Sequence, residues 1–459
     1  MVAGSGASAG RQRAVLPRSS LGGYTGEQAE CGNLKMTDHD AIVFSLQLAV
    51  MLAVGLVAAL VMVRVRLPVI LGELVGGVII GPTVLGALAP GWFDWLFPAG
   101  GGSSVARNAV TQLGMLFFLL VAGLEVDYAA IVRRGASIVW TSLCGVALPF
   151  VAGLLLALAL PGLWGSQAQA DPVLFALFVG TALSISALPV IARILMDMNL
   201  LKTELGTVVM AAATIDDLIG WTLFALILGE FLPGGSPAGS PLITLLLAAG
   251  LWTFTLTLGR NIARRTMQWM PEHMPWPGSF LMVTAIAVLA VGALTEAVGI
   301  HAFLGAFLVG IALAENAEAS NPARDAVRQF VTYFFAPIYF VSVGLQANFI
   351  ANFDLPLVLV VVVVACASKI VGASVGARLG GLSPRKALAV GFGMNARGAM
   401  GMILASLALS YGLIDQRVFV ALIIMALVTS LLSGPVMQRL LAAEPRPAAL
   451  GEGRPVTTS

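Results

Sequence analysis

Thirteen apolar runs constrain the fold of this 459-residue chain more than any other feature of its sequence. An α-helix needs about 20 apolar residues to cross the hydrocarbon core of a bilayer, and most of the runs reach that length. Hydrophobic residues make up 58% of the chain and charged residues only 10%, whereas soluble domains carry about 25% charged residues. We therefore expect an all-α polytopic membrane protein, and a soluble fold is excluded. The expected transmembrane spans are 41–63, 68–89, 108–124, 136–160, 172–196, 205–231, 240–258, 279–298, 301–315, 330–347, 355–377, 386–410 and 417–440.

The basic residues test this map of spans. When successive loops are placed on alternate sides of the membrane, seventeen lysines and arginines fall on one side. The other side holds two in its loops and four in the N-terminal tail. Basic loops mark the cytoplasmic side of a membrane protein. The pattern predicts a multi-pass protein of the plasma membrane with its N-terminus outside and its C-terminus in the cytoplasm, and the arginine-rich composition indicates a bacterial source.

Two of the spans are interrupted at corresponding positions. Thirteen spans divide into six, one and six. Because the central span is a single crossing, the second set of six spans runs through the membrane in the opposite orientation to the first, as in a protein with two inverted six-helix repeats. The fifth span then corresponds to the twelfth; the fifth contains Pro189, and the twelfth contains Gly391–Gly398 with Asn395 and Arg397 inside it. Proline removes a backbone donor, and glycine weakens a helix by about 1 kcal/mol. We expect crossed broken helices that frame a midplane ion site; an ordinary proline kink and close packing at glycine are the alternative.

A pair of adjacent carboxylates, Asp216 and Asp217, lies in the middle of the sixth apolar run. A single Asp at the centre of a membrane helix costs about 2.5 to 3.5 kcal/mol, so two are expensive. Acidic groups at this depth usually face a bundle interior or a wet cavity and handle ions or protons. An inert pair whose charge is satisfied by its neighbours is the competing interpretation.

Hard oxygen ligands suit a dehydrated Na+ or K+, and this part of the chain can supply them. Asp217 and Asp216 provide carboxylates, and Thr214, Ser184 and Ser186 provide hydroxyls. Both carboxylates also titrate. If the charged site can move across the membrane only when a cation or protons neutralise it, the protein exchanges the cation for protons.

A lysine deep in the eleventh span, Lys369, is the second charged anomaly. It could snorkel to the cytoplasmic edge, but the span ends near Arg378, about 13 Å further on at 1.5 Å per residue. An ion pair with Asp216 is the better interpretation, and Lys369 could also carry a proton itself. Arg397, in the broken twelfth span, is expected to be structural, either by binding exposed carbonyl groups or by pairing with an acid.

The other charged residues and the two tails give weaker signals. Glu125 and Asp127 fall at a span end near Arg133 and are expected to form a solvated cytoplasmic rim. Glu73 is expected to help form a funnel or a contact between helices. His301 is expected to pack against its neighbours or to cap a helix. Residues 1–40 are expected to be a disordered tail, with translation starting at Met1 or Met36, and residues 442–459 a cytoplasmic tail.

The sequence carries no signal for a cofactor. It contains no Walker motif, and Cys31, Cys144 and Cys366 lack the spacing of a metal or disulfide site. No enzyme active site, nucleic-acid partner or cofactor is expected, and the metal expected is a monovalent cation at Asp217.

Seven stretches of the chain resemble the monovalent cation/proton antiporter superfamily, specifically its bacterial Na+/H+ exchanger branch, which is related to Kef-type and plant cation/H+ exchangers. They cover about residues 41 to 440 in the order that the family has. The matching stretches are LPVILGELVGGVIIGPTVLG (67–86), GLEVD (123–127), TALSISALPVIARIL (181–195), TIDDLIGW (214–221), HAFLGAFLVGIALAEN (301–316), PIYFVSVGLQANF (337–349) and GMNARGAMGMILA (393–405).

The resemblance implies a fold and roles for the central residues. Asp217 would bind the cation, and Asp216 would pair with Lys369. A scaffold domain (41–135 and 279–350) would form a homodimer, and a core domain would carry the ion past it in an elevator movement. The core would comprise 136–231 and 351–441, with 232–278 as a linker helix and loop.

Two departures from the family pattern matter. The chain ends soon after Leu441, so no nucleotide-binding regulatory domain of the Kef type is expected. Many relatives carry a carboxylate shortly after the Arg-Gly of the twelfth span, but Ala399, Met400 and Gly401 follow here, which leaves the partner of Arg397 open. The sequence thus predicts a secondary active antiporter that exchanges Na+ or K+ for H+. The exchange is expected to be electrogenic. A proton-coupled exporter of a drug or an ion-loaded ionophore and a cation channel are the alternatives.

Overall fold

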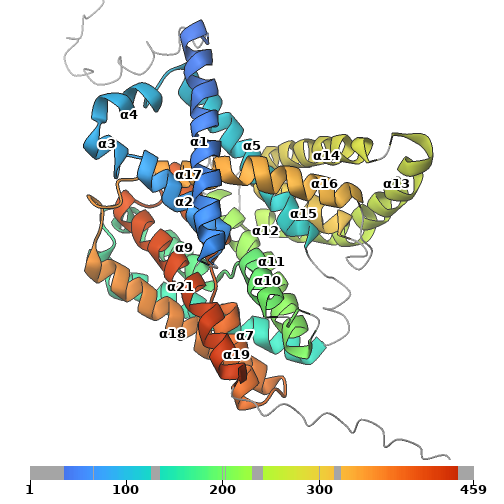
Figure 1. The fold of residues 1–459 in the computed structure, drawn as a ribbon. Coiled ribbons are helices and arrows are strands. Elements are labelled where there is room, and N and C mark those ends of the chain that lie inside the picture. The colour runs from blue at the N-terminus through green and yellow to red at the C-terminus, as the bar shows by residue number, and fades with distance from the viewer. Residues whose placement is uncertain are drawn as a thin grey trace, which may run out of the picture.

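The computed structural model describes residues 36–65, 67–125, 135–198, 200–201, 203–229, 241–275, 277–298, 300–314 and 322–442. Helices and the turns between them make up these ranges, and no strand occurs within them (Figure 1). The all-α membrane fold expected from the sequence is therefore confirmed. The expectations for the tails before residue 36 and after residue 442, for Asp127 and for residues 230–240 fall outside the described ranges.

The helices of the N-terminal half lead from the first apolar run to the carboxylate pair. Their bounds are α1 Asp38–Arg64, α2 Val69–Ile80, α3 Leu85–Leu88, α4 Pro90–Leu96, α5 Gly102–Leu124, α7 Gly135–Ala159, the 3-10 helix η1 Pro161–Leu163, α8 Gln167–Ala170, α9 Pro172–Ser184, α10 Leu188–Asp197 and α11 Glu204–Gly229.

The helices of the C-terminal half include two short π-helical stretches. Their bounds are α12 Pro241–Phe254, the π-helix η2 Thr255–Gly259, α13 Arg260–His273, α14 Gly278–Ala297, α15 Ala302–Leu313, α16 Pro322–Phe330, the π-helix η3 Val331–Phe335, α17 Ala336–Leu345, α18 Leu355–Leu379, α19 Pro384–Met394, α20 Gly398–Ser410 and α21 Gln416–Ala442.

Eleven helical stretches of the described chain are long and apolar enough to cross a membrane, and each overlaps one of the predicted spans. The count of thirteen is not confirmed, because two predicted spans have no counterpart among these eleven stretches. The prediction at 301–315 corresponds to α15, which has 12 residues. The prediction at 240–258 corresponds to the 14 residues of α12 and the π-helix η2, after which α13 is polar.

Several long helices begin where a capping side chain precedes a proline. Asp171 accepts a hydrogen bond from Leu174 N (3.0 Å) at the start of α9, and Asp354 accepts one from Leu357 N (3.2 Å) at the start of α18. In both helices a proline stands in the first turn, where its missing N–H costs no hydrogen bond. These caps fix where the apolar stretches of the two helices begin.

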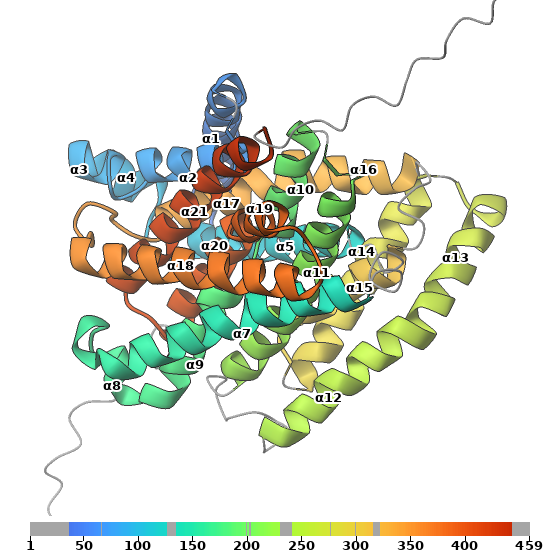
Figure 2. The same ribbon diagram turned by 90° about the horizontal axis from the view of Figure 1, so that it is seen from below.

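The helices pack in two groups. In the first group, α1 and α17 contact each other and both contact α2 and α5, and α15 lies along α5. In the second, α7 runs alongside both α9 and α18, and α18 and α21 both pack on α19 (Figure 2). Glycine allows backbone contact inside the first group: a Cβ on Gly77 would lie 2.1 Å from the carbonyl oxygen of Val341, so α2 and α17 can touch only without a side chain there.

Two interrupted helices cross inside the second group, as the sequence predicts. One break separates α9 from α10 over residues 185–187, and the other separates α19 from α20 over residues 395–397. Ala187 N donates a hydrogen bond to the carbonyl oxygen of Ala396 (2.7 Å), so the two breaks bind each other directly. Pro189 stands in the first turn of α10, just after the break. Gly398 opens α20 with a φ of 33°, and a Cβ there would lie 2.4 Å from Val190 Cγ2.

Candidate functional site

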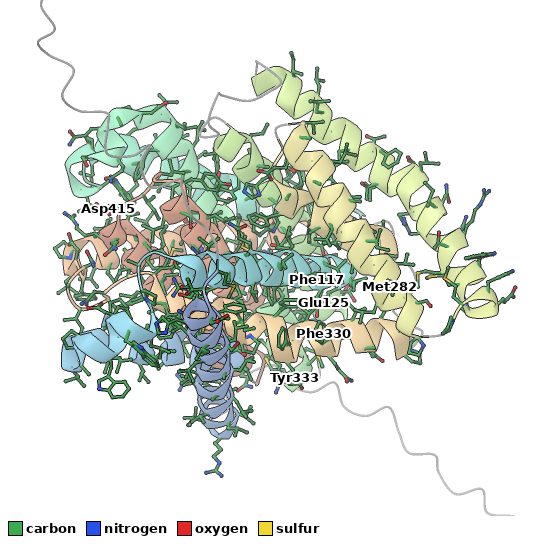
Figure 3. The ribbon with its side chains drawn as sticks, turned by 90° about the horizontal axis from the view of Figure 1, so that it is seen from above. Phe117, Glu125, Met282, Phe330, Tyr333 and Asp415 are labelled. Carbon is green, nitrogen blue, oxygen red and sulfur yellow. The ribbon has the colours of Figure 1, made fainter. Side chains whose placement is uncertain are left out.

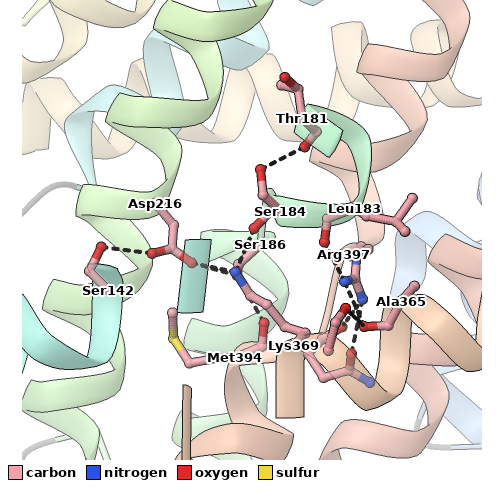
Figure 4. A network of polar contacts seen from close by, with 12 residues as sticks. Ser142, Thr181, Leu183, Ser184, Ser186, Asp216, Ala365, Lys369, Met394 and Arg397 are labelled. Atoms are coloured by element: carbon pink, nitrogen blue, oxygen red, sulfur yellow. Dashed lines mark hydrogen bonds and ion pairs between the residues drawn. The ribbon is translucent and has the colours of Figure 1, made fainter. Parts of the chain in front are cut away.

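The broken end of α9 binds two buried cationic side chains. Lys369 Nζ donates to the carbonyl oxygen of Ser184 (2.5 Å), and Arg397 Nη2 donates to that of Leu183 (2.6 Å). The last carbonyl groups of a helix have no partner within it, and the helix dipole makes this end negative. The interruption of α9 therefore creates an anionic position within the membrane, and the two cations occupy it (Figure 4).

Arg397 is held by oxygen atoms from three helices or their ends. Besides Leu183, its Nη2 donates to the carbonyl oxygen of Ala365 on α18 (3.0 Å), and its Nη1 donates to Asn395 Oδ1 (2.9 Å). These contacts are of the carbonyl-binding kind expected for a structural Arg397. They also answer the question left by the missing carboxylate after Gly398: backbone and amide oxygens surround the guanidinium.

Asp216 forms a saturated network with its neighbours (Figure 4). Its Oδ2 lies 2.5 Å from Lys369 Nζ, and both side chains are 0% exposed. Ser142 Oγ donates a hydrogen bond to Oδ1 (2.8 Å), and Ser186 Oγ, whose single hydrogen atom is shared with the carbonyl oxygen of Met394 (2.8 Å), lies 3.1 Å from Oδ2. The ion pair between Lys369 and Asp216 is the one expected from the sequence, whereas Ser142 was missed. A small polar residue inside the fourth apolar run was its only signal.

Asp217 differs from its neighbour although it is equally buried. It is 1% exposed, and its Oδ1 has no hydrogen-bond partner. Successive residues on an α-helix point about 100° apart, so the two carboxylates of α11 meet different surroundings. No cluster of three or more acidic, histidine or cysteine side chains that could hold a metal ion occurs among the described residues. Asp217 thus keeps a free oxygen atom for a ligand.

The three hydroxyl groups expected as cation ligands lie around the break but have other partners. Ser186 Oγ donates to the carbonyl oxygen of Met394 (2.8 Å) and contacts Asp216. Ser184 and Thr214 donate to carbonyl groups of their own helices, at 2.8 Å and 3.0 Å. Serine and threonine in a helix commonly bond back to the preceding turn in this way. Their roles as ligands remain predictions.

Glu125 is not part of a solvated rim, and that expectation is wrong. Its side chain is only 17% exposed at the end of α5, and it pairs with Arg328 Nη2 on α16 at 3.0 Å. Glu73, expected in a funnel or helix contact, is buried on α2, and its Oε2 has no hydrogen-bond partner. His301 packs as expected: its ring stacks on Phe303 with 4.0 Å between ring centroids.

The chain is similar to known cation/proton antiporters. Residues 49–443 match the family model described as sodium/hydrogen exchanger, transmembrane. The chain is 32% identical over 408 residues to cation/H(+) antiporter 20 of Arabidopsis thaliana, a match that covers 85% of this chain and 48% of the plant protein. It is 29% identical to the Na(+)/H(+) antiporter NhaS4 of a Synechocystis strain, covering 83% of this chain and 92% of that one.

The fold is also similar to a solved structure. The sodium proton antiporter NhaP1 of Methanocaldococcus jannaschii, determined at pH 8, superposes with a TM-score of 0.67 over 88% of this chain and 99% of that one, at 16% identity. At this identity the likeness concerns the fold alone. The chain spans about half the length of the plant relatives that it matches.

Proposed function

The chain belongs to the sodium/hydrogen exchanger family, and from that premise we propose that it is an antiporter that exchanges Na+, or K+, for H+ across the plasma membrane. One observation carries the proposal: of two adjacent buried carboxylates, Asp216 is saturated by Lys369 and two serines, whereas Asp217 keeps an oxygen atom without a partner. A bound cation or a proton would supply the partner that this oxygen atom of Asp217 lacks.

The exchange follows from the cost of a bare buried charge. An ionised carboxylate that is taken out of water without a partner is strongly unfavourable, so Asp217 crosses the membrane only when it is neutralised. A monovalent cation neutralises it in one direction and a proton in the other. Lys369 keeps Asp216 neutralised meanwhile, and uptake of a proton by Asp216 would release the lysine. Because two carboxylates can take up protons against one cation, we propose that the exchange is electrogenic.

The proposed movement is of the elevator type. We assign residues 41–135 and 279–350 to a scaffold that dimerises, and residues 136–231 and 351–441 to a moving core. Two side-chain contacts between the proposed scaffold and core support this division, because they are hydrogen bonds without an ion pair: Gln346 Nε2 and Ser406 Oγ are 2.6 Å apart, and His301 Nε2 and the Tyr411 hydroxyl are 2.8 Å apart. Neutral hydrogen bonds can be exchanged for others when one group slides along the other.

The cation assignment rests on chemistry and on relatives. Carboxylate and hydroxyl oxygens suit alkali cations, and the name of the cyanobacterial relative states that it exchanges Na+ for H+. We place the N-terminus outside the membrane and the C-terminus in the cytoplasm, because the basic residues gather in the loops on one side.

Transport by the purified protein in vesicles tests the proposal. With a pH-sensitive dye inside acid-loaded vesicles, external Na+ or K+ should dissipate the proton gradient, faster when a membrane potential of the favourable sign is applied. Asp217→Asn should abolish this exchange. Asp354→Asn is the matched control, since Asp354 is a helix-capping carboxylate that pairs with Arg417 at 2.9 Å. Full activity of Asp217→Asn would refute the site.

A further inference from the structure

The helix that lies within the predicted linker has one packed face and one open face. α12, η2 and α13 follow one another without a gap from Pro241 to His273, and we call this continuous helix the linker rod. It runs along the edge of the molecule, where α13 packs on α14 and α15 (Figure 2). Thr255 and Met270 are buried on the packed face. The opposite face is left to whatever surrounds the protein.

The open face of the linker rod changes in character along its length. Phe254, Leu258 and Ile262 follow one another at intervals of four residues, and their side chains are each about half exposed. Residues four apart lie on the same side of a helix, so these three form an apolar stripe. Arg264 and Arg265 come directly after the stripe, and both are exposed. An apolar stripe that ends in two cations is complementary to an anionic phospholipid, which has apolar acyl chains and a negative phosphate.

A hollow of about 250 Å³ lies where the stripe meets the two arginines. Its walls are formed by Leu258, Asn261, Ile262, Arg264 and Arg265. Arg264 Nη2 donates a hydrogen bond to Asn261 Oδ1 (3.1 Å), which holds this guanidinium at the wall. Sites for drug-sized molecules measure about 300 to 1,000 Å³, so the hollow suits a smaller group such as a single lipid headgroup. The side chains of the rod project outward at the edge of the molecule (Figure 3).

The charges of α13 favour an anion at this hollow. The helix carries three arginines, of which Arg260 is the first, and one acidic residue, Glu272. The ion pairs found among the described residues include neither Arg264 nor Arg265. Two adjacent cations repel each other, and an anion that both of them contact relieves this repulsion. Guanidinium groups bind phosphate oxygens with two parallel hydrogen bonds, so a phosphate fits this pair.

We propose that the open face of the linker rod binds one anionic phospholipid, with its phosphate at Arg264 and Arg265 and its acyl chains along the apolar stripe. The lipid is available there, because the chain is a membrane protein and the stripe is exposed on its outside. Basic residues that flank a membrane helix are attracted to anionic headgroups in the same way. Binding at the linker rod is independent of the proposed antiport, because none of these residues belongs to the carboxylate site.

Removal of the two charges tests the headgroup position. The full chain is purified in a non-ionic detergent, freed of lipid and titrated with dioleoylphosphatidylglycerol, and bound lipid is counted by native mass spectrometry. The double variant Arg264→Gln, Arg265→Gln should raise the lipid concentration for half-occupancy of the tightest site about twentyfold. Dioleoylphosphatidylcholine has the same acyl chains and no net charge, and it should bind the wild type about twentyfold more weakly than the anionic lipid does.

Two further double variants separate a site from a general effect of charge. Arg64→Gln with Arg439→Gln removes the same charge from the ends of α1 and α21 and should bind the anionic lipid as the wild type does. Arg264→Lys with Arg265→Lys keeps the charge and should recover most of the affinity. Equal losses in the two glutamine variants, or equal binding of the two lipids by the wild type, would overturn the proposal.

Photolabelling locates the lipid without any substitution, so it does not depend on the folding of a variant. The wild type is reconstituted in phosphatidylcholine vesicles that contain a photoactivatable phosphatidylglycerol, and we expect the label on residues 254–265. A label confined to other segments would overturn the proposal. Displacement of the lipid by an equal concentration of inorganic phosphate would also overturn it, because the hollow would then be a site for free anions. A third contradicting result is a glutamine variant that loses a dimer but binds the lipid normally, because the open face would then bind a second copy of the chain.

Discussion

The interior of the proposed core and its proposed boundary with the scaffold both hold buried acidic side chains, but the two regions use the oxygen atoms of these groups differently. In the interior, Asp216 makes an ion pair and two serine hydrogen bonds. At the boundary, Asp217 and Glu125 each keep a buried oxygen atom without a partner. The difference separates a carboxylate that already has a counter-ion from carboxylates that keep an oxygen atom free of any protein partner.

The same contrast applies to the cations of the two regions. Lys369 and Arg397 are fully buried and bind the carbonyl end of α9, so their charges are part of the architecture. Arg328 is largely exposed and holds one oxygen atom of Glu125. Substitutions in the interior should therefore act mainly on stability, and those at the boundary mainly on transport.

The largest effect on stability is expected from Lys369→Met. This change leaves Asp216 as a buried charge without its counter-ion and should lower the free energy of unfolding by about 3 to 5 kcal/mol. Thermal unfolding of the purified protein in detergent measures it. Combining Lys369→Met with Asp216→Asn removes both charges and should recover most of the loss. A single variant as stable as the wild type would show that the interior pair does not hold the fold.

A smaller effect of the opposite sign is expected from Asp217→Asn. Here no ion pair is lost and a poorly satisfied buried charge is removed, so the free energy of unfolding should rise by about 1 kcal/mol. The same unfolding experiment applies, without added Na+ or K+. The contrast between the two regions breaks down if Asp217→Asn destabilises the protein as much as Lys369→Met does.

The smallest effect is expected from Ser406→Ala, which removes the two reciprocal hydrogen bonds between the side chains of Ser406 on α20 and Gln346 at the end of α17 (2.6 and 3.0 Å). A single neutral hydrogen bond contributes about 1 kcal/mol to stability. Because these bonds join the proposed core to the proposed scaffold, the maximal exchange rate should change while the apparent KM does not. Ser410→Ala is the control, since Ser410 bonds only to the carbonyl oxygen of Ser406 in its own helix. Identical behaviour of the two variants would argue against sliding at this boundary.

Local chemistry explains which parts of the fold could be predicted from sequence. Eleven spans were predictable because each is a continuous apolar run, and the breaks were predictable because proline and glycine interrupt matched runs. The span at 240–258 is not among the eleven, and hydrophobicity alone does not show that α12 continues after Phe254 as a π-helix and then as the polar helix α13.

The candidate site likewise contains residues that could be predicted from the sequence and residues that could not. Asp216, Asp217 and Lys369 stand out because charge is rare in an apolar run. Ser142 does not, because its contact with Asp216 joins residues 74 positions apart and a serine is unremarkable within a membrane helix. Glu125 was misjudged because it stands at a span end that is followed by Arg133 and Arg134, whereas its partner Arg328 lies far away in sequence, on α16. Contacts between segments far apart in the chain decide both cases.

Release of protons on cation binding tests the central claim most directly. The purified protein is held in weakly buffered detergent solution at neutral pH, Na+ or K+ is added, and the change in pH is recorded. If Asp217 is neutralised by either a cation or a proton, the wild type releases protons as it binds the cation and Asp217→Asn releases none. Cation binding by the wild type without proton release, or equal release from Asp217→Asn, would contradict the account.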